Sequence, residues 1–149
     1  MSAEKKSGNP MPQLGQIQNI YLLLRHGETD FNAKKRFPGF LDVPLNENGR
    51  NQVKAVRLPA TPNLIISSNL IRTVHTAKAV GASHNFPDEI QLDSRLREKH
   101  GGVVEGSLIQ QIQTLYPDIW NAWDLEDKFA VAAKSQYPEG KSDVDVANR

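Results

Sequence analysis

Short apolar runs alternate with stretches of helical periodicity along this chain. Ile20–Leu24 is wholly apolar and is followed at once by polar residues, a pattern typical of a strand buried on both faces of a parallel sheet. Asn63–Ile66 predicts a second buried strand, and Ile90–Leu92 predicts a short third one.

Helical signals fill the intervals between these runs. Asn46 is a good N-cap, and Pro59 and Pro62 are expected to end the helix that it starts. Apolar residues at helical spacing predict further helices from about Leu70 to Ala82, over Leu108–Leu115 and after Pro117, and Ser142 is a candidate N-cap for a last one. The order strand, helix, strand, helix indicates a layered α/β fold with parallel strands.

Composition narrows the class of protein without identifying it. The chain has 149 residues, enough for one domain, and its formal net charge of +1 gives no overall attraction to nucleic acid or an anionic membrane. It contains no cysteine, which excludes thiol nucleophiles and zinc–thiolate sites. No apolar run is long enough to span a bilayer, and a cytoplasmic location is expected. Residues 1–18 are predicted to form a flexible polar tail, and residues 19–149 the domain.

The segment from Arg25 to Asn32 carries the candidate chemistry. It follows the first predicted strand, and in open α/β sheets ligands bind at the carboxyl ends of strands. A guanidinium can grip two phosphate oxygens, and a glycine lets the backbone approach closely. His26 between such residues could attack phosphorus through a ring nitrogen. On these grounds alone a solvated histidine and an ordinary turn glycine stay open as alternatives.

Four blocks in the right order resemble the motifs of the histidine phosphatase superfamily, the phosphoglycerate-mutase-like fold. They are Arg25-His26-Gly27-Glu28-Thr29 with Asn32; Phe37 to Leu45 with Gly49 and Gln52; Ser67 to Thr73 with Thr76 and Ala77; and Leu96-Arg97-Glu98 with Gly102, Glu105 and Gly106. A weaker fifth block runs from Gly140 to Arg149. The resemblance implies a three-layer α/β/α fold with a mostly parallel central sheet.

The resemblance also implies roles for single residues. His26 would be the nucleophile, Arg25 and Arg72 would clamp the phosphate oxygens, and Glu98 would be the general acid and base. An exposed Glu98 paired with Arg95 or Arg97 is the structural alternative. Further positions have supporting roles: Asn32 as a phosphate donor, Pro38 and Gly39 at the substrate mouth, and Gly102 and Gly106 as backbone-shaping residues. His75 is expected to face solvent, and no role is expected for His84 or His100.

Complete members of the family carry a second histidine on a later strand, and no histidine follows His100 in this sequence. The domain is therefore expected to be incomplete at its C-terminus, with an apolar edge on the first strand.

The leading hypothesis is a phosphoryl-transfer enzyme that uses a phosphohistidine and needs no metal or other cofactor. It would hydrolyse the phosphate of a small phosphorylated metabolite, with transfer of the phosphate, as in a mutase, left open. The alternative is a pseudoenzyme or phosphate-ligand binder with little turnover. A metal site at His26 and Glu28 has too few ligands to be favoured. A homodimer is left open by the predicted apolar edge.

Overall fold

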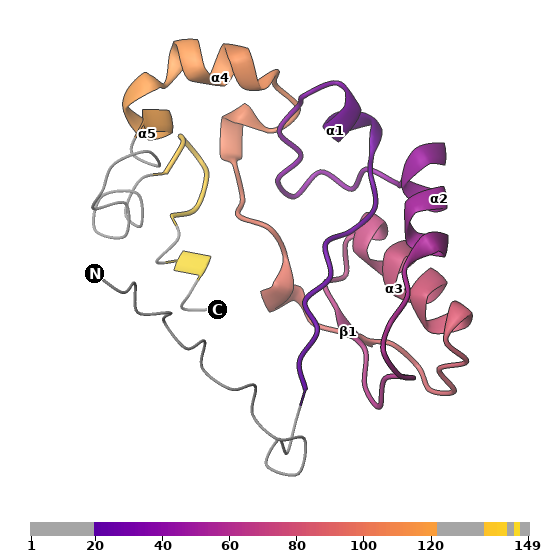
Figure 1. Ribbon diagram of the computed structural model, residues 1–149. Helices are drawn as coiled ribbons and strands as arrows, with labels where there is room; N and C mark the ends of the chain where they lie inside the picture. The colour runs from indigo at the N-terminus through magenta and orange to yellow at the C-terminus, as the bar shows by residue number, and fades with distance from the viewer. Residues whose placement is uncertain (1–19, 122–135, 143–144, 147–149) are drawn as a thin grey trace, which may run out of the picture.

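The structure is a computed structural model that describes residues 20–121, 136–142 and 145–146. The predicted tail of residues 1–18 lies outside these residues, as do Trp123 and Asp143. The elements in chain order are α1 (Asp30–Ala33), α2 (Glu47–Ala55), β1 (Ile66–Ser67), α3 (Ile71–Ser83), β2 (Gln91–Leu92), the 3-10 turns η2 (Ser94–Leu96) and η3 (Gly102–Val104), α4 (Ile109–Leu115) and α5 (Pro117–Asn121). Figure 1 shows α2 and α3 side by side, with α4 and α5 at the other end of the molecule.

The predicted helices that lie within the described residues are confirmed, whereas the one expected after Ser142 falls largely outside them. The Asn46 side chain caps α2 by accepting from the Gly49 N–H at 2.8 Å, and α2 ends at Ala55, before the two prolines. The N-terminus of α3 has no cap from its own residues; Asp42 supplies one from a distant loop, accepting from the Ile71 N–H at 2.5 Å. Pro117 begins α5, the position in a helix where the missing N–H costs nothing.

The parallel sheet is present but short among the described residues. β1 pairs with β2 in parallel, with Ile66 opposite Gln91 and Ser67 opposite Leu92. The fold is therefore α/β with parallel strands, as predicted. The second predicted strand is only partly buried, because the Leu64 and Ile66 side chains are 51% and 50% exposed.

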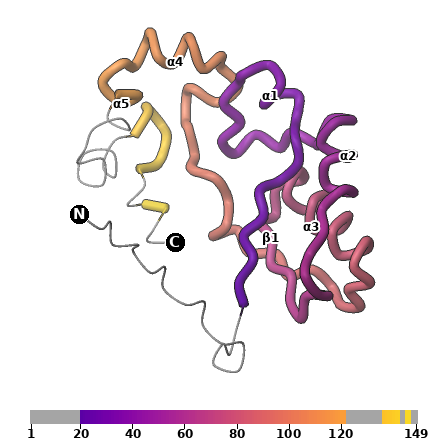
Figure 2. Tube along the Cα trace, in the orientation of Figure 1, coloured from indigo at the N-terminus to yellow at the C-terminus, as the bar shows by residue number. Residues whose placement is uncertain are grey.

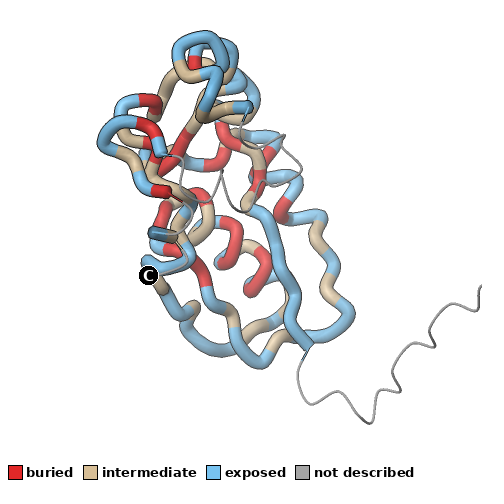
Figure 3. Tube along the Cα trace, turned by 90° about the vertical axis from the view of Figure 1, so that its left-hand side faces the viewer, coloured by how far each residue is buried: buried red, intermediate tan, exposed pale blue. Residues whose placement is uncertain are grey.

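The prediction that Ile20–Leu24 forms a buried strand is wrong for this structure. The segment is extended, but within the described part of the chain no backbone hydrogen bond joins residues 20–26 to a neighbouring strand. Its five apolar side chains are between 49% and 101% exposed, and the segment is pale blue in Figure 3. A strand needs a neighbour to pair its backbone and cover its side chains. The five apolar side chains are therefore exposed on an extended segment that belongs to no sheet among the described residues.

Among the described residues, two groups of buried apolar side chains lie in different parts of the fold. Val53 on α2 and Ala77 and Val80 on α3 are buried where these two helices contact each other. A second cluster contains Val104, Ile112 and Tyr137, with further aromatic residues packed against it. Figure 2 shows the first group's helices on one side and the second cluster's segments, α4 and residues 136–142, on the other. The segment that carries the candidate site runs between the two groups.

In the part of the chain that the structure describes, no helix is both long and apolar enough to cross a membrane.

Candidate active site

Two helices hold the loop that begins at His26. The Gly27 N–H donates to the Thr76 hydroxyl on α3 at 3.1 Å, and the Glu28 N–H donates to Oε1 of Gln52 on α2 at 2.9 Å. A Cβ on Gly27 would lie 2.5 Å from the Gly49 carbonyl oxygen on α2. Only glycine allows the loop to come this close to the helix. The packing of the loop against α2 therefore requires a glycine at position 27, next to the candidate nucleophile.

The His26 ring is neutral and keeps one ring nitrogen unprotonated. Its Nδ1 lies 2.7 Å from the Gly27 carbonyl oxygen, which can only accept, so Nδ1 carries the proton and the lone pair is on Nε2. Burial lowers the pKa of His26 below its ordinary value of 6.5, and the positive charges of Arg72 and Arg25 lower it further. The hydrogen bond to Gly27 and the charge of Glu98 act in the opposite direction and are outweighed. The imidazole is therefore neutral at pH 7.

This lowered pKa predicts a pH dependence of stability that does not require turnover. Unfolded His26 takes up a proton near pH 6.5, whereas the folded ring resists protonation until a lower pH. Acidification therefore favours the unfolded chain, and the free energy of unfolding falls as the pH drops from 6.5 through the folded pKa. Urea denaturation at several pH values should show a steeper loss for the wild-type chain than for His26→Asn. Parallel losses in the two proteins would contradict the assignment.

A pocket of about 370 Å³ opens in front of His26. Its volume is at the lower end of the range of small-molecule sites, roughly 300–1,000 Å³. Both polar and apolar side chains line it: Arg25, His26, Asn32, Arg36, Phe37, Pro38, Glu98 and Ile109. The structure therefore brings together five residues that were predicted for the site, from segments up to 73 positions apart in the sequence (98 − 25).

Arg72 does not line the pocket but contacts Glu98, which does. Its side chain is 1% exposed, and Nη2 donates to Glu98 Oε2 at 3.1 Å and to the Gly39 carbonyl at 2.8 Å. Nη1 donates to the Leu41 carbonyl at 2.9 Å, while Nε is buried without a hydrogen-bond partner among the described residues. Arg72 does not line the pocket in this structure; it holds Glu98, which does.

Asn32 has one end of its amide occupied and the other available. Its Oδ1 accepts from the Thr29 N–H at 3.0 Å and from the Thr29 hydroxyl at 2.8 Å, in the capping box of α1. These bonds fix which way the amide is turned. Nδ2 has no partner within the described part of the chain, and Asn32 lines the pocket, so an N–H donor is left for an anionic ligand.

The loop with Pro38 and Gly39 is held over the pocket by a carboxylate that the sequence analysis did not assign. Glu105 Oε1 accepts from the Phe40 N–H at 2.8 Å and from the Gly101 N–H at 2.9 Å. Gly39 has a φ of +49°, and a Cβ there would lie 2.1 Å from the same oxygen. Pro38 lines the pocket, whereas Gly39 does not and contributes its carbonyl to Arg72.

Gly102 and Gly106 shape the backbone, as predicted, because their φ angles of +58° and +81° lie in the region that favours glycine.

The remaining histidines lie outside the pocket. His75 is exposed, as predicted, and His84 is structural, with Nδ1 2.8 Å from the Val80 carbonyl oxygen and Nε2 accepting from the Leu58 N–H. Among the described residues there is no group of three or more side chains suited to hold a metal ion. Sequence reasoning assigned no site role to three pocket residues, Arg36, Phe37 and Ile109. For Arg36 the available signal was a cation in the turn-rich loop after His26, which is too common to be diagnostic.

A phosphate-sized anion would meet a neutral histidine, cations and a carboxylate in this pocket, the groups that phosphoryl transfer needs. Comparison with known proteins agrees with a site for phosphoryl transfer. The model of the histidine phosphatase superfamily (branch 1) matches residues 21–149, and the chain belongs to this family.

Its relatives are phosphatases and mutases. The chain is 37% identical over 131 residues to a glucosyl-3-phosphoglycerate phosphatase of Mycolicibacterium vanbaalenii, covering 86% of this chain and 55% of that protein. It is 34% identical to a probable phosphoglycerate mutase of Serratia proteamaculans, covering 85% and 57%. The structure resembles a mycobacterial glucosyl-3-phosphoglycerate phosphatase in complex with VO3, with a TM-score of 0.69, 35% identity, and coverage of 83% and 59%. The chain thus spans somewhat more than half the length of these proteins.

Proposed function

We propose that this chain is a phosphoryl-transfer enzyme of the histidine phosphatase type, which hydrolyses the phosphate monoester of a small metabolite through a phosphohistidine on His26. One observation carries the proposal: the His26 ring is neutral, holds its proton on Nδ1, and lines a pocket that also contains Arg25 and Glu98. A histidine that served only the fold would not need a cation and a carboxylate beside it in a cavity.

In the first step, His26 Nε2 attacks phosphorus, and a P–N bond forms as the ester P–O bond breaks. Arg25 and the Asn32 Nδ2–H group stabilise the negative charge on the phosphoryl oxygens as the transition state develops. Glu98, in its protonated form, gives its proton to the leaving oxygen, so that an alcohol departs.

In the second step, a water molecule takes the place of the alcohol. Glu98, now a carboxylate, accepts a proton from that water, the P–N bond breaks, and inorganic phosphate leaves with His26 neutral again. Arg72 supports both steps by holding Glu98 at 3.1 Å from its own guanidinium. Because Arg72 is fully buried, it is a positioning residue for Glu98 in this arrangement, and a direct contact with phosphate would require it to move.

The second candidate function is a phosphate-ligand binder without turnover. It is favoured by the exposed apolar segment Ile20–Leu24, because the backbone that leads into His26 pairs with no strand among the described residues. A loosely held nucleophile loses part of the advantage of orientation, because small misplacements are costly in catalysis. Such a protein would bind inorganic phosphate or vanadate and form no phosphohistidine.

The experiment that separates the two candidates is intact-mass measurement of the whole chain after incubation with p-nitrophenyl phosphate. The quench must avoid acid, because the P–N bond of phosphohistidine hydrolyses in acid. The expected result is a gain of one phosphoryl group. A folded chain that gains no mass while still binding phosphate in calorimetry would be a binder, and the proposed enzyme would be rejected.

A further inference from the structure

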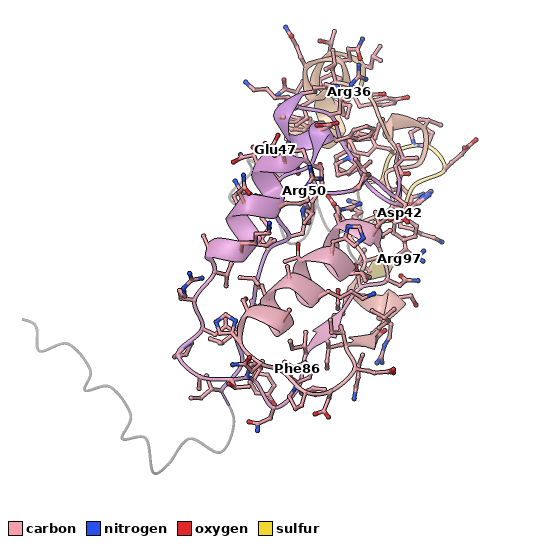
Figure 4. All side chains as sticks on the ribbon, turned by 90° about the vertical axis from the view of Figure 1, so that its right-hand side faces the viewer. Arg36, Asp42, Glu47, Arg50, Phe86 and Arg97 are labelled. Atoms are coloured by element: carbon pink, nitrogen blue, oxygen red, sulfur yellow. The ribbon has the colours of Figure 1, made fainter. Side chains whose placement is uncertain are left out.

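Gln52 stands in one of the motifs that resemble those of the family, but the proposed reaction gives it no role. It is an exposed residue of α2 and does not line the pocket in front of His26. Its Oε1 atom accepts from the Glu28 N–H at 2.9 Å, so the side chain reaches the loop that carries the candidate nucleophile. Figure 4 shows α2, with Glu47 and Arg50 labelled, next to α3.

The peptide bond between Gly27 and Glu28 links Gln52 to the His26 ring. Its carbonyl oxygen lies 2.7 Å from His26 Nδ1, and its N–H is the group that Gln52 accepts. The C=O and N–H groups of a trans peptide lie in one plane and point in opposite directions. Fixing the N–H on α2 therefore directs the carbonyl oxygen toward the imidazole.

Other residues anchor the peptides on either side of this one. The Gly27 N–H donates to the hydroxyl of the buried Thr76 at 3.1 Å, and the Asn46 N–H donates to the Glu28 carbonyl at 3.0 Å. Between these anchors, the peptide of the Gly27 carbonyl is bonded, among the described residues, to the Gln52 side chain and to the histidine ring. The direction of that carbonyl thus depends on Gln52.

The glycine at position 27 makes this restraint necessary. Packing requires a glycine there, because a Cβ would lie 2.5 Å from the Gly49 carbonyl oxygen. Without a Cβ, however, the torsion that turns the Gly27 carbonyl is only weakly restricted by steric contacts. The hydrogen bond to Gln52 supplies the order that the glycine removes.

The direction of the Gly27 carbonyl decides which nitrogen of His26 can attack. A proton on Nδ1 leaves the lone pair on Nε2, the atom that attacks phosphorus in the proposed reaction. In water, a neutral histidine side chain favours the opposite tautomer, with its proton on Nε2. The carbonyl has to reverse this preference, and it does so best when its peptide cannot turn.

We propose that Gln52 is a positioning residue that keeps the lone pair of His26 on Nε2 by holding the peptide between Gly27 and Glu28. The inference rests on the proposed function, because it takes His26 as the nucleophile. Gln52 does not line the pocket and acts through this peptide alone.

The tautomer of His26 can be measured without turnover, from long-range proton–nitrogen NMR spectra of the whole chain. The spectra are recorded at about pH 8, where a histidine of ordinary pKa is neutral, and the His26 signals are those lost in His26→Asn. The wild-type ring should show the Nδ1–H form. Gln52→Met keeps the length of the side chain but removes the acceptor, so the Nε2–H form should appear beside it. Gln52→Glu keeps an acceptor oxygen and should retain the wild-type tautomer.

The rate of phosphohistidine formation from p-nitrophenyl phosphate should follow the tautomer. We expect it to fall about three- to tenfold in Gln52→Met, the range for the loss of one hydrogen bond. Gln52→Glu should restore the rate. The affinity for inorganic phosphate, measured by calorimetry, should not change in either variant, because Gln52 does not line the pocket.

Gln111→Met is the matched control. Gln111 is also an exposed helical glutamine whose Oε1 accepts from a backbone N–H, that of Leu108 at 3.2 Å, and it does not line the pocket. This variant should keep both the tautomer and the rate.

Three results would overturn the role of Gln52: an unchanged tautomer in Gln52→Met, an equal shift in Gln111→Met, or a shifted tautomer with an unchanged rate. A wild-type chain that forms no phosphohistidine would overturn the proposed function and, with it, the catalytic consequence. The comparison of tautomers would still decide whether Gln52 holds the His26 ring.

Discussion

His26→Asn is expected to abolish the phosphoryl mass gain completely. Asparagine can keep the hydrogen bond to the Gly27 carbonyl, because its Nδ2–H group can donate where Nδ1 of His26 does. It has no basic nitrogen lone pair to attack phosphorus, so the covalent intermediate cannot form. The measurement is the intact mass of the quenched protein, with circular dichroism to establish that the variant folds.

The control for this prediction is His75→Asn. His75 is an exposed histidine on α3, so it tests whether any accessible imidazole accepts the phosphoryl group from a reactive aryl ester. This variant should gain mass at the wild-type rate. A phosphoryl group that persists in His26→Asn and disappears in His75→Asn would show that the labelling is a surface reaction.

Glu98→Gln is expected to slow phosphorylation of His26 by alkyl phosphates about 10²- to 10⁴-fold, the usual contribution of a general acid. Glutamine is isosteric and can still accept a hydrogen bond from Arg72 through Oε1, so the local geometry is retained. It cannot supply a proton to the leaving alkoxide. With p-nitrophenyl phosphate the loss should be far smaller, because nitrophenolate is a weak base and leaves without protonation.

The rate of phosphohistidine formation from glycerol 3-phosphate and from p-nitrophenyl phosphate, followed by intact mass, checks this difference. The phosphoenzyme should also persist longer in Glu98→Gln, because the same residue activates water in the second step. Glu28→Gln is the control: Glu28 accepts from Asn46 at 2.8 Å and does not line the pocket. Equal losses with the two esters would mean that Glu98 only positions its neighbours.

The helices could be predicted well from the sequence because their signals are local. Asn46 as an N-cap, prolines after α2, and apolar spacing in α3 and α4 each act within a few residues. Ile20–Leu24 could not be predicted correctly in this way. An apolar run indicates that a strand would gain from burial, but whether it is buried depends on a neighbour that the run itself does not specify.

The candidate site likewise has features that the sequence indicates and features that only the folded chain sets. The sequence by itself indicated the residue types of the candidate site, since His26, Arg25 and Glu98 stand in recognisable motifs and all line one pocket. It also indicated where glycine would be needed, because only glycine tolerates a left-handed backbone without strain.

Only the tertiary structure decided how these groups act. It placed Arg72 behind Glu98 and left Arg36 facing the pocket without a carboxylate partner among the described residues. It also lowered the pKa of His26 through burial and through charges from distant segments. Protonation and ion pairing depend on distance and on access of water, and both are set by segments far apart in the chain. A motif can therefore point to the candidate nucleophile, but the charges that surround it are known only once the chain has folded.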